Sequence, residues 1–598
     1  MGRTVDLQLQ TRILNWLGRH WKLITLATWL AVSAWFILQG WDAIRSFELG
    51  DTDDNMRMMQ VRDLLRGQDW FDLRQYRLNP PVGSNIHWSR LVDLPIAGLI
   101  LVLRPFLGGA AAERWAVAIA PLLPYLLLLF SIALTVRRLV DPRAYAIAFI
   151  ALFFAVLTNG MFLPERIDHH GWQLALLAFS TAGIADPQRW RGGIVLGIST
   201  ALSLAIGLEM LIYLAISGIA MTLFWVADRD ERQRLTGYAV ALAGGTALAY
   251  SVFASYANRG AVCDALSIVW LTDALLGGAL LIGLARLSPV DWKTRLALGV
   301  GAGLVVAGVH ASMFPHCLRR LEGISPEVER LWLSHVREAR PVYDHGWAMA
   351  TLTLALPIVG TIGWLLLMWS KRTDAEFLRR IMAAVAPGVA ATLLLFWQIR
   401  TGAAAQMLAL SGTAGFIWLL IPRTWNSRWM IVRVLGTCVV TIIGVGAAVP
   451  LTLYYLPVAK EKTITESPGP SRSCNSLQDF YPVDLQPKGI VFTFVDLAPR
   501  LITVTHHDSV TGPYHRNGQQ IADVMNAFRG SEAQAHVLIA KYHSTYLLTC
   551  PSGSTTSMFM SEAPKGFYAQ LQRGHVPKWL SRVDLPNDSP FQMWRVTG

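Results

Sequence analysis

The chain has 598 residues, of which 53% are hydrophobic and only 15% charged, with a formal net charge of +12. A soluble protein of this size has about a quarter of its residues charged, so the composition excludes an ordinary soluble enzyme. The apolar residues form blocks of about 20, the length that a helix needs to cross a bilayer. We therefore predict a polytopic α-helical membrane protein. Its positive residues lie mainly in short loops, where they indicate orientation rather than a nucleic-acid surface.

The N-terminal segment "RILNWLGRHWK" is basic and amphipathic, and no small-residue cleavage site follows the first apolar block. We expect a retained first span with a cytoplasmic N-terminus. Thirteen spans are predicted, at residues 23–40, 114–136, 144–163, 171–185, 191–206, 208–227, 236–254, 265–287, 295–314, 347–370, 378–398, 402–422 and 431–456. A shorter block, 94–109, carries Arg104 and is predicted to be an interfacial or re-entrant helix.

The loops that this arrangement places inside are nearly all basic, as in 137–143, 229–234 and 371–380. Counting 94–109 as a span would move these charges outside, against the positive-inside rule. We therefore expect a bacterial inner-membrane protein with three long segments on the periplasmic side: residues 41–113, residues 315–346 and the tail.

Two domains are predicted, a transmembrane domain at 1–456 and a soluble periplasmic domain at 457–598. The tail has strand-like runs, "GIVFTFVDL" and "STYLLTC", and a polar helix near 517–530. These features predict a small α+β domain, joined by the linker "TESPGPSRS".

Four of the five cysteines lie in predicted outer regions. Cys474 and Cys550 share the tail, and Cys263 and Cys317 lie in outer loops, so two disulfides fit an oxidising compartment. Free, buried thiols are the alternative.

Four polar groups share the outer side although they are far apart in sequence. They are the acidic stretch "GDTDDNMRMMQVRDLLRG" around Asp53, with Asp54 and Arg57; "PERIDHHGWQ" with Asp168, His169 and His170; "VREARP" with Glu338; and "WQIRTGAAAQ" with Arg400. Burying a carboxylate at mid-bilayer costs about 2.5–3.5 kcal/mol, so the acidic stretch must lie at the membrane surface.

Taken singly, each group also fits a solvated loop, interfacial polar residues or a snorkelling arginine. Taken together, carboxylates and an imidazole from separate loops suit a divalent cation. An arginine at the membrane boundary suits the phosphate of a lipid-linked substrate. The combination indicates chemistry with a phosphate leaving group at a bilayer surface.

The order of these elements resembles the membrane-embedded GT-C glycosyltransferases, specifically the catalytic subunits of oligosaccharyltransferases. In that family an outer-loop Asp, here Asp53, precedes a helix ending like "VRDLLRG", and "WFDLRQYRLNPPVGSNIHWSRLVDLP" resembles the aromatic and proline-glycine stretch that follows. The motif "DHH" resembles its Asp-x-acid motif, "VREARP" the setting of its catalytic Glu, and Arg400 its phosphate-contacting Arg. The family also has 13 spans and an outer C-terminal domain.

This sequence departs from the family at two places. His170 replaces the second acid of the Asp-x-acid motif, so a mixed carboxylate and imidazole site would tolerate Mn²⁺ well and Mg²⁺ less well. The tail lacks the Trp-Trp-Asp signature that reads an Asn-x-Ser/Thr acceptor, so sequon glycosylation is not expected. It has "GPYHRNG" at 512–518 instead, either a structural turn or a contact to donor or acceptor through Tyr514, His515 and Arg516.

The resemblance implies inverting transfer of a sugar or oligosaccharide from a polyprenyl-(di)phosphate donor to an envelope lipid, polysaccharide or protein. Asp53, Asp168 and His170 would hold Mg²⁺ or Mn²⁺, and Arg400 would meet the donor phosphate. Glu338, or Asp53, would align or deprotonate the acceptor, and segment 315–346 would close over the donor. Asp54, Arg57, His169 and, in "IGLEML", Glu209 are further candidate substrate-binding residues.

Two other functions remain open. A carrier for a small or lipid-linked substrate would keep ionisable residues near the midplane and show repeated halves, whereas these spans are nearly free of charge and no internal repeat is evident. A catalytically inactive relative could instead support envelope assembly.

Overall fold

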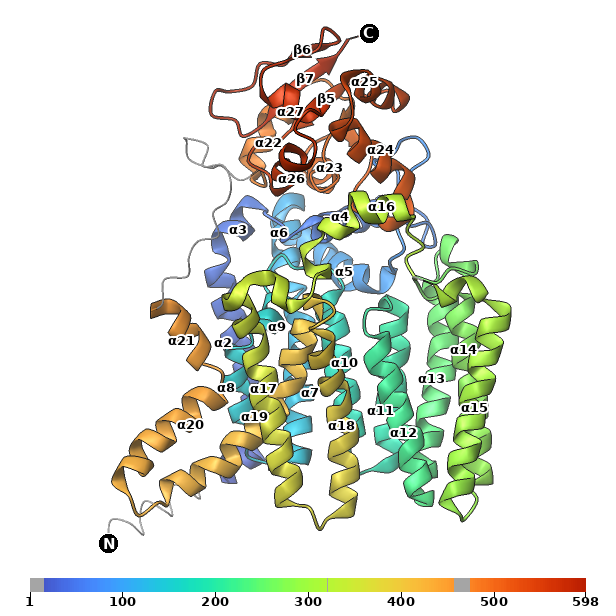
Figure 1. Cartoon of the computed structure of the whole chain (residues 1–598), viewed down its shortest axis with the longest axis vertical. Coiled ribbons are helices and arrows are strands. Elements are labelled where there is room, and N and C mark those ends of the chain that lie inside the picture. Colours follow the sequence, from blue (N-terminus) through green and yellow to red (C-terminus); the bar gives the residue numbers. More distant parts are fainter. Residues whose placement is uncertain (1–14, 320, 456–473, 598) are drawn as a thin grey trace.

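The computed structural model describes residues 15–319, 321–455 and 474–597. Figure 1 shows a bundle of long helices with a smaller domain of helices and strands, built from the C-terminal residues, covering one end. We call this end of the bundle the domain end. The connections α12–α13, α14–α15 and α17–α18 lie at the opposite end (Figure 1) and carry basic residues such as Arg232, Lys293 and Lys371.

Eight helical segments of the described chain are long and apolar enough to cross a membrane. They are α2 (Trp21–Gln39), α6–α7 (Gly109–Leu139), η1–α13 (Arg229–Phe253), α14 (Ile268–Leu287), α15 (Trp292–Met313), η6–α17 (Val342–Ser370), α18 (Ala375–Leu394) and η7–α19 (Ile399–Trp425). Each overlaps a predicted span. The protein is thus a multi-pass membrane protein.

The other five predicted spans form helices that are shorter, broken or less apolar than these eight, so the count of 13 stays a prediction. The block 144–163 divides into α8 (Tyr145–Phe153) and α9 (Val156–Gly160). The next three blocks form α10 (His170–Ile184), α11 (Arg189–Ile206) and α12 (Leu211–Ala227). The last block bends by 90° between Val432–Gly444 and Ala448–Tyr454, where Gly446 has φ +81°, a conformation that costs glycine little.

The segment between α2 and α6 lies at the domain end of the bundle, beneath the C-terminal domain (Figure 1). It contains α3 (Trp41–Ser46), α4 (Thr52–Leu65), the short strands β1 (Arg74–Gln75) and β2 (Ser84–Asn85), and α5 (Arg90–Leu107). The predicted interfacial or re-entrant helix corresponds to α5, which is not among the eight candidate spans. Its Ile96 and Ile100 are buried whereas Phe106 is 82% exposed, the pattern of a helix with one apolar face against the protein and one outside it.

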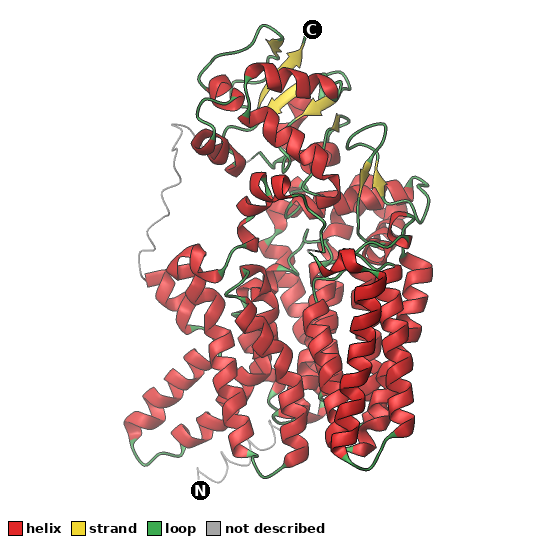
Figure 2. Cartoon of the chain, turned by 45° about the vertical axis from the view of Figure 1, so that its right-hand side comes forward, coloured by secondary structure: helices red, strands yellow, loops and turns green. Residues whose placement is uncertain are grey.

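The C-terminal residues form a five-stranded sheet in the order β4-β3-β5-β7-β6, in which β3 pairs in parallel with β4 and β5 and the other pairs are antiparallel. The strands are β3 (Ile490–Phe492), β4 (Asp508–Ser509), β5 (Tyr546–Thr549), β6 (Leu580–Arg582) and β7 (Gln592–Val596). Helices pack around them (Figure 2): α22 (Leu477–Asp484), α23 (Ala498–Val504), α24 (Gly518–Arg529), α25 (Glu532–Lys541), α26 (Ser554–Glu562) and α27 (Phe567–Gln572). The predicted strands near 489–497 and 544–550 and the helix near 517–530 are present. The linker at 465–473 lies outside the described residues.

Both expected disulfides are present. Cys263 pairs with Cys317 at a Cα–Cα distance of 5.4 Å, and Cys474 pairs with Cys550 at 6.4 Å. Cys438 is a free thiol. The alternative of free thiols is therefore wrong for both pairs.

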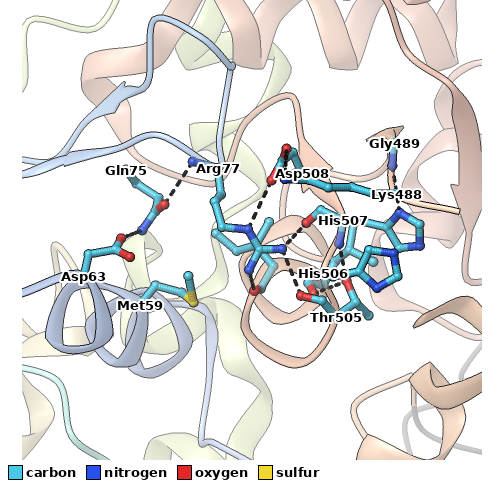
Figure 3. A network of polar contacts seen from close by, with 12 residues as sticks. Met59, Asp63, Gln75, Arg77, Lys488, Gly489, Thr505, His506, His507 and Asp508 are labelled. Atoms are coloured by element: carbon cyan, nitrogen blue, oxygen red, sulfur yellow. Dashed lines mark hydrogen bonds and ion pairs between the residues drawn. The ribbon is translucent and has the colours of Figure 1, made fainter. Parts of the chain in front are cut away.

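Residues 77–79 join the sheet of the C-terminal domain. The Ser509 amide donates to the Arg77 carbonyl over 2.9 Å, and the Asn79 amide donates to the Ser509 carbonyl over 2.8 Å. Figure 3 shows the Arg77 side chain bound to the Asp508 carboxylate and to the carbonyls of Thr505 and His507. The exposed edge of β4 is thereby covered by the segment that carries α4, which fixes the domain over the bundle.

Candidate functional site

At the N-terminus of α4, three closely spaced acids have different roles. The Asp51 side chain caps the helix by accepting from the amides of Asp53 (2.9 Å) and Asp54 (3.2 Å), and the Asp54 carboxylate accepts from the Asp51 amide (3.0 Å). This capping box uses two of the three acids. In the described part of the chain, the Asp53 carboxylate has no hydrogen-bond or ion-pair partner.

The loop before α10 docks onto this helix end. The Asp168 amide donates to the Asp54 carboxylate over 2.9 Å, and Arg166 binds the carboxylates of Asp54 (3.1 Å), Asp168 (2.8 Å) and Asp51. Nδ1 of His170 lies 3.0 Å from the Asp168 carboxylate. Two segments more than 100 residues apart thus meet at one cluster of acids.

The electrostatics single out Asp53. Burial, then the charges of Asp51 and Asp168, raise the pKa of Asp53 to about 8, and the Glu338 carboxylate adds to the rise. Burial alone would raise the pKa of Asp168, but His170 and Arg166 hold it well below its usual value. The pKa values of the two carboxylates therefore shift in opposite directions, as at many functional sites.

The charge of Glu338 also acts on this cluster. It lies in η5 (Arg337–Ala339) and is exposed, and its effect on the Asp53 pKa places the two carboxylates within electrostatic range. On one side its loop is anchored by α16 (Pro326–Leu331), which packs into the core of the C-terminal domain. On the other side the Ile399 amide donates to the Arg340 carbonyl over 2.8 Å.

Arg400 follows directly after that anchor, in η7 (Ile399–Thr401). Its side chain is exposed and has no ion pair with any described residue. Its charge interacts with Tyr213 at the start of α12. An unpaired guanidinium thus stands beside the Glu338 loop at the end of two candidate spans.

His169 and Glu209 form a supporting pair. The His169 Nε2 lies 3.0 Å from the Glu209 carboxylate, which also accepts from Gln173 over 2.9 Å. Burial would raise the pKa of Glu209, but His169 and His170 lower it below its usual value. The His169 ring stacks on His170 and packs against Trp88, with ring centroids 4.4 Å and 5.7 Å apart.

Two predicted substrate-binding residues have structural roles instead. Arg57 is fully buried, donates to Asp93 over 2.9 Å, and stacks 4.3 Å from the Trp88 ring. Asp54 is also fully buried and occupied by the capping box and Arg166. Because neither side chain is open to a ligand, this geometry gives no support to their predicted role.

Sequence reasoning missed Arg166 and Trp88 as organising residues. Arg166 stands two residues before Asp168 in "PERIDHH". This short spacing could have indicated that the arginine pairs with that acid. Trp88 lies within the stretch 70–95 that resembles the family's aromatic segment, but that resemblance gives no role to this residue, and its contacts with Arg57 and His169 follow only from the fold.

Three groups of potential metal ligands occur within the described residues. In one, Cys263 and Cys317 are joined by a disulfide. In the second, with His87 and His515, the Asp264 carboxylate is occupied by Arg516. These two groups therefore do not suit a cation as they stand.

In the third group, the carboxylates of Asp51, Asp54 and Asp168 all bind Arg166. Asp53 lies next to this group with an unpaired carboxylate, and His170 contributes an imidazole. A divalent cation suits the Asp53 side of the cluster, because Arg166 binds the other three acids and leaves Asp53 without an ion pair, although the charge of His170 already acts on Asp53.

Comparison with known proteins gives the class of the fold. No family model matches this chain, and no curated protein matches it. Three solved structures of the Archaeoglobus fulgidus oligosaccharyltransferase are similar. The archaeal enzyme AglB, in complex with an inhibitory peptide and a dolichol-phosphate, has a TM-score of 0.67 at 16% identity, covering 95% of this chain and 73% of that one.

The other two structures agree. The form tethered to an acceptor peptide with an NVT sequon gives a TM-score of 0.66 at 15% identity, covering 98% and 75% of the two chains. The complex with Zn and sulfate gives 0.59 at 16%, covering 96% and 73%. The chain therefore shares the fold of the archaeal oligosaccharyltransferase, in agreement with the resemblance that the order of its motifs indicates.

Proposed function

We propose that this protein is a glycosyltransferase that moves a sugar or oligosaccharide from a polyprenyl-(di)phosphate donor to an envelope acceptor. The observation that carries this proposal is the meeting of Asp53, Asp168, His170 and Glu338 at one end of a membrane bundle, beside the unpaired Arg400. Acids, an imidazole and a guanidinium at a bilayer surface suit a substrate that combines a lipid tail, a phosphate and a sugar.

Mg²⁺ or Mn²⁺ fits the donor set of Asp53, Asp168 and His170. Such a cation, when bound, supplies a Lewis acid that neutralises charge on a departing phosphate. The unpaired carboxylate of Asp53 is the residue that most needs this neutralisation, since Arg166 already offsets the neighbouring acids.

Side chains of the protein itself would bind the donor phosphate and activate the acceptor. Arg400 would bind the donor phosphate through charge-assisted hydrogen bonds and hold the lipid end of the donor at the membrane boundary. Glu338 would orient the acceptor and take its proton as the acceptor atom bonds to the anomeric carbon. The bond from that carbon to the phosphate oxygen breaks on the opposite face, so the anomeric configuration inverts. His169, held by Glu209, would line the donor side.

Known structures support the donor class. The archaeal oligosaccharyltransferase has been solved with a dolichol-phosphate and, separately, with Zn and sulfate. A lipid phosphate, a divalent metal and a tetrahedral anion are the three ligands that the proposed site requires. The acceptor stays open among lipid, polysaccharide and protein, because the C-terminal domain lacks the Trp-Trp-Asp signature.

Sidedness follows from the charge distribution. Basic connections lie at the end opposite the C-terminal domain (Figure 1), which favours a cytoplasmic position for that end. Both disulfides lie at or near the domain end, which favours an oxidising compartment there. We infer a bacterial inner-membrane protein with a periplasmic site.

The test uses the purified protein in nanodiscs with a radiolabelled polyprenyl-phosphate sugar and extracted envelope material as acceptor. We expect label to move to the acceptor, to stop on chelation with EDTA, and to resume with Mn²⁺ or Mg²⁺. Asp53→Asn should abolish transfer, while Asp69→Asn, at an exposed acid of the same segment, should not. Label that crosses the membrane of proteoliposomes without chemical transfer would instead establish a carrier. Full activity in Asp53→Asn, Asp168→Asn and Glu338→Gln would overturn the site.

A further inference from the structure

The turn at 512–518, "GPYHRNG", binds three separate segments of the membrane domain. The Tyr514 hydroxyl donates to the Thr52 carbonyl over 3.0 Å, and the Asn517 side chain accepts from the Asn85 amide over 3.0 Å. Arg516 pairs with Asp264, with two nitrogens each 2.7 Å from a carboxylate oxygen. A solvated turn would make none of these contacts.

Tyr514 lies directly against the candidate centre. It is 2% exposed, and it bonds to the residue that precedes Asp53. Its ring packs edge-on against Trp88 at 5.6 Å, and Trp88 packs against His169 at 5.7 Å. One tyrosine of the C-terminal domain therefore contacts the α4 end directly and the Asp168–His170 segment through one ring.

The Arg516 contact anchors the turn. The Asp264 carboxylate also receives His515 Nε2 at 2.6 Å, and both charged side chains of the Arg516–Asp264 pair are at most 10% exposed. Asp264 follows Cys263, whose disulfide to Cys317 ties it to the start of segment 315–346. The turn is thus held against covalently fixed structure while Tyr514 projects from it.

We propose that the turn 512–518 is the device by which the C-terminal domain positions the α4 N-terminus for cation binding, with Tyr514 as the positioning residue. This inference rests on the proposed function, since it concerns the same site. In this proposal the C-terminal domain has a role in cation binding that does not require it to recognise an acceptor.

The experiment measures Mn²⁺ binding to the full-length protein in nanodiscs by electron paramagnetic resonance, with Mn²⁺ as the only ligand. Tyr514→Phe removes one hydroxyl. The matched control is Tyr546→Phe, which also removes a buried hydroxyl that donates to a carbonyl, that of Pro487 at 3.1 Å, inside the C-terminal domain. We expect the Kd for Mn²⁺ to rise about three- to tenfold in Tyr514→Phe, the effect of one hydrogen bond, and to stay unchanged in Tyr546→Phe.

A second variant, Arg516→Lys, keeps the positive charge but cannot form the bidentate ion pair with Asp264. Its Kd for Mn²⁺ should therefore also rise. Equal Kd values in wild type and Tyr514→Phe, or equal weakening in Tyr546→Phe, would overturn the inference and leave the proposed function intact. A wild type that binds no Mn²⁺, or an Asp53→Asn variant that binds it as well as wild type, would overturn the cation site and the inference together.

Discussion

The guanidinium of Arg166 lies 2.8 Å from the carboxylate of Asp168 and also binds Asp54 at 3.1 Å and Asp51. One partly buried cation therefore joins the end of α4 to the loop before α10. Its single positive charge offsets part of the negative charge of these acids, and it does not bind Asp53.

Arg166→Gln should destabilise the protein strongly. Asp54 and Asp168 have fully buried carboxylates, and removing the partner of a buried charge costs about 3–5 kcal/mol. The control is Arg143→Gln, whose pair with Asp141 is 34% and 21% exposed and should be worth less than about 1 kcal/mol. Thermal unfolding of both variants in detergent measures the difference. Similar melting temperatures for the two variants would show that Arg166 does not hold the cluster together.

Glu338→Gln should slow sugar transfer by about 100-fold or more, the usual contribution of a general base. The KM for the donor should change little, because the amide keeps the shape of the side chain and Arg400 stays in place. The control is Glu329→Gln, on α16 of the same segment, which tests whether the loss of any acid in this loop slows transfer. Kinetics with a labelled donor measure both variants, and a normal rate in Glu338→Gln would remove this residue from the mechanism.

Glu165 gives the protein a pH-dependent stability. It is 2% exposed, and burial, together with Glu48, raises its pKa from 4.5 to about 8. The folded protein therefore holds this proton more tightly than the unfolded chain. The stabilising effect is complete below about pH 4.5 and declines as the pH rises to about 8.

Glu165→Gln should remove this decline. At pH 8.5 the variant should melt at least about 2 °C higher than wild type, whereas near pH 4.5 the two should be similar. Melting curves across this range, with the exposed Glu376→Gln as control, provide the measurement. A Glu165→Gln variant less stable than wild type at pH 8.5 would show that the carboxylate is ionised and paired.

Removing the disulfide of the C-terminal domain should destabilise that domain. Cys474 and Cys550 are separated by 76 residues, and closing such a loop is worth about 4 kcal/mol in the chain-entropy model. Cys474→Ser should unfold the domain at lower temperature and expose it to protease. Cys438→Ser removes the free thiol and should change neither property.

The amino-acid sequence alone predicted the membrane class, thirteen spans of which eight are long apolar helices in the structure, and two disulfides with free thiols as the alternative. Each of these depends on one-dimensional information: the length of an apolar block, or the compartment that a loop occupies. It also predicted that the polar motifs share one side of the membrane, because sidedness is inferred from counting spans and charges.

Tertiary structure decided which residues of those motifs are open to a ligand. Asp51, Asp53 and Asp54 look alike in sequence, but helix capping uses Asp51 and Asp54 and leaves Asp53 unpaired. Arg57 and Arg400 are both arginines near a boundary, yet one is buried against Trp88 and the other is exposed. Tertiary contacts also account for short helices such as α10, whose inner turns are covered by neighbouring helices rather than lipid. Burial and pairing depend on which distant segments pack together, so no local pattern encodes them.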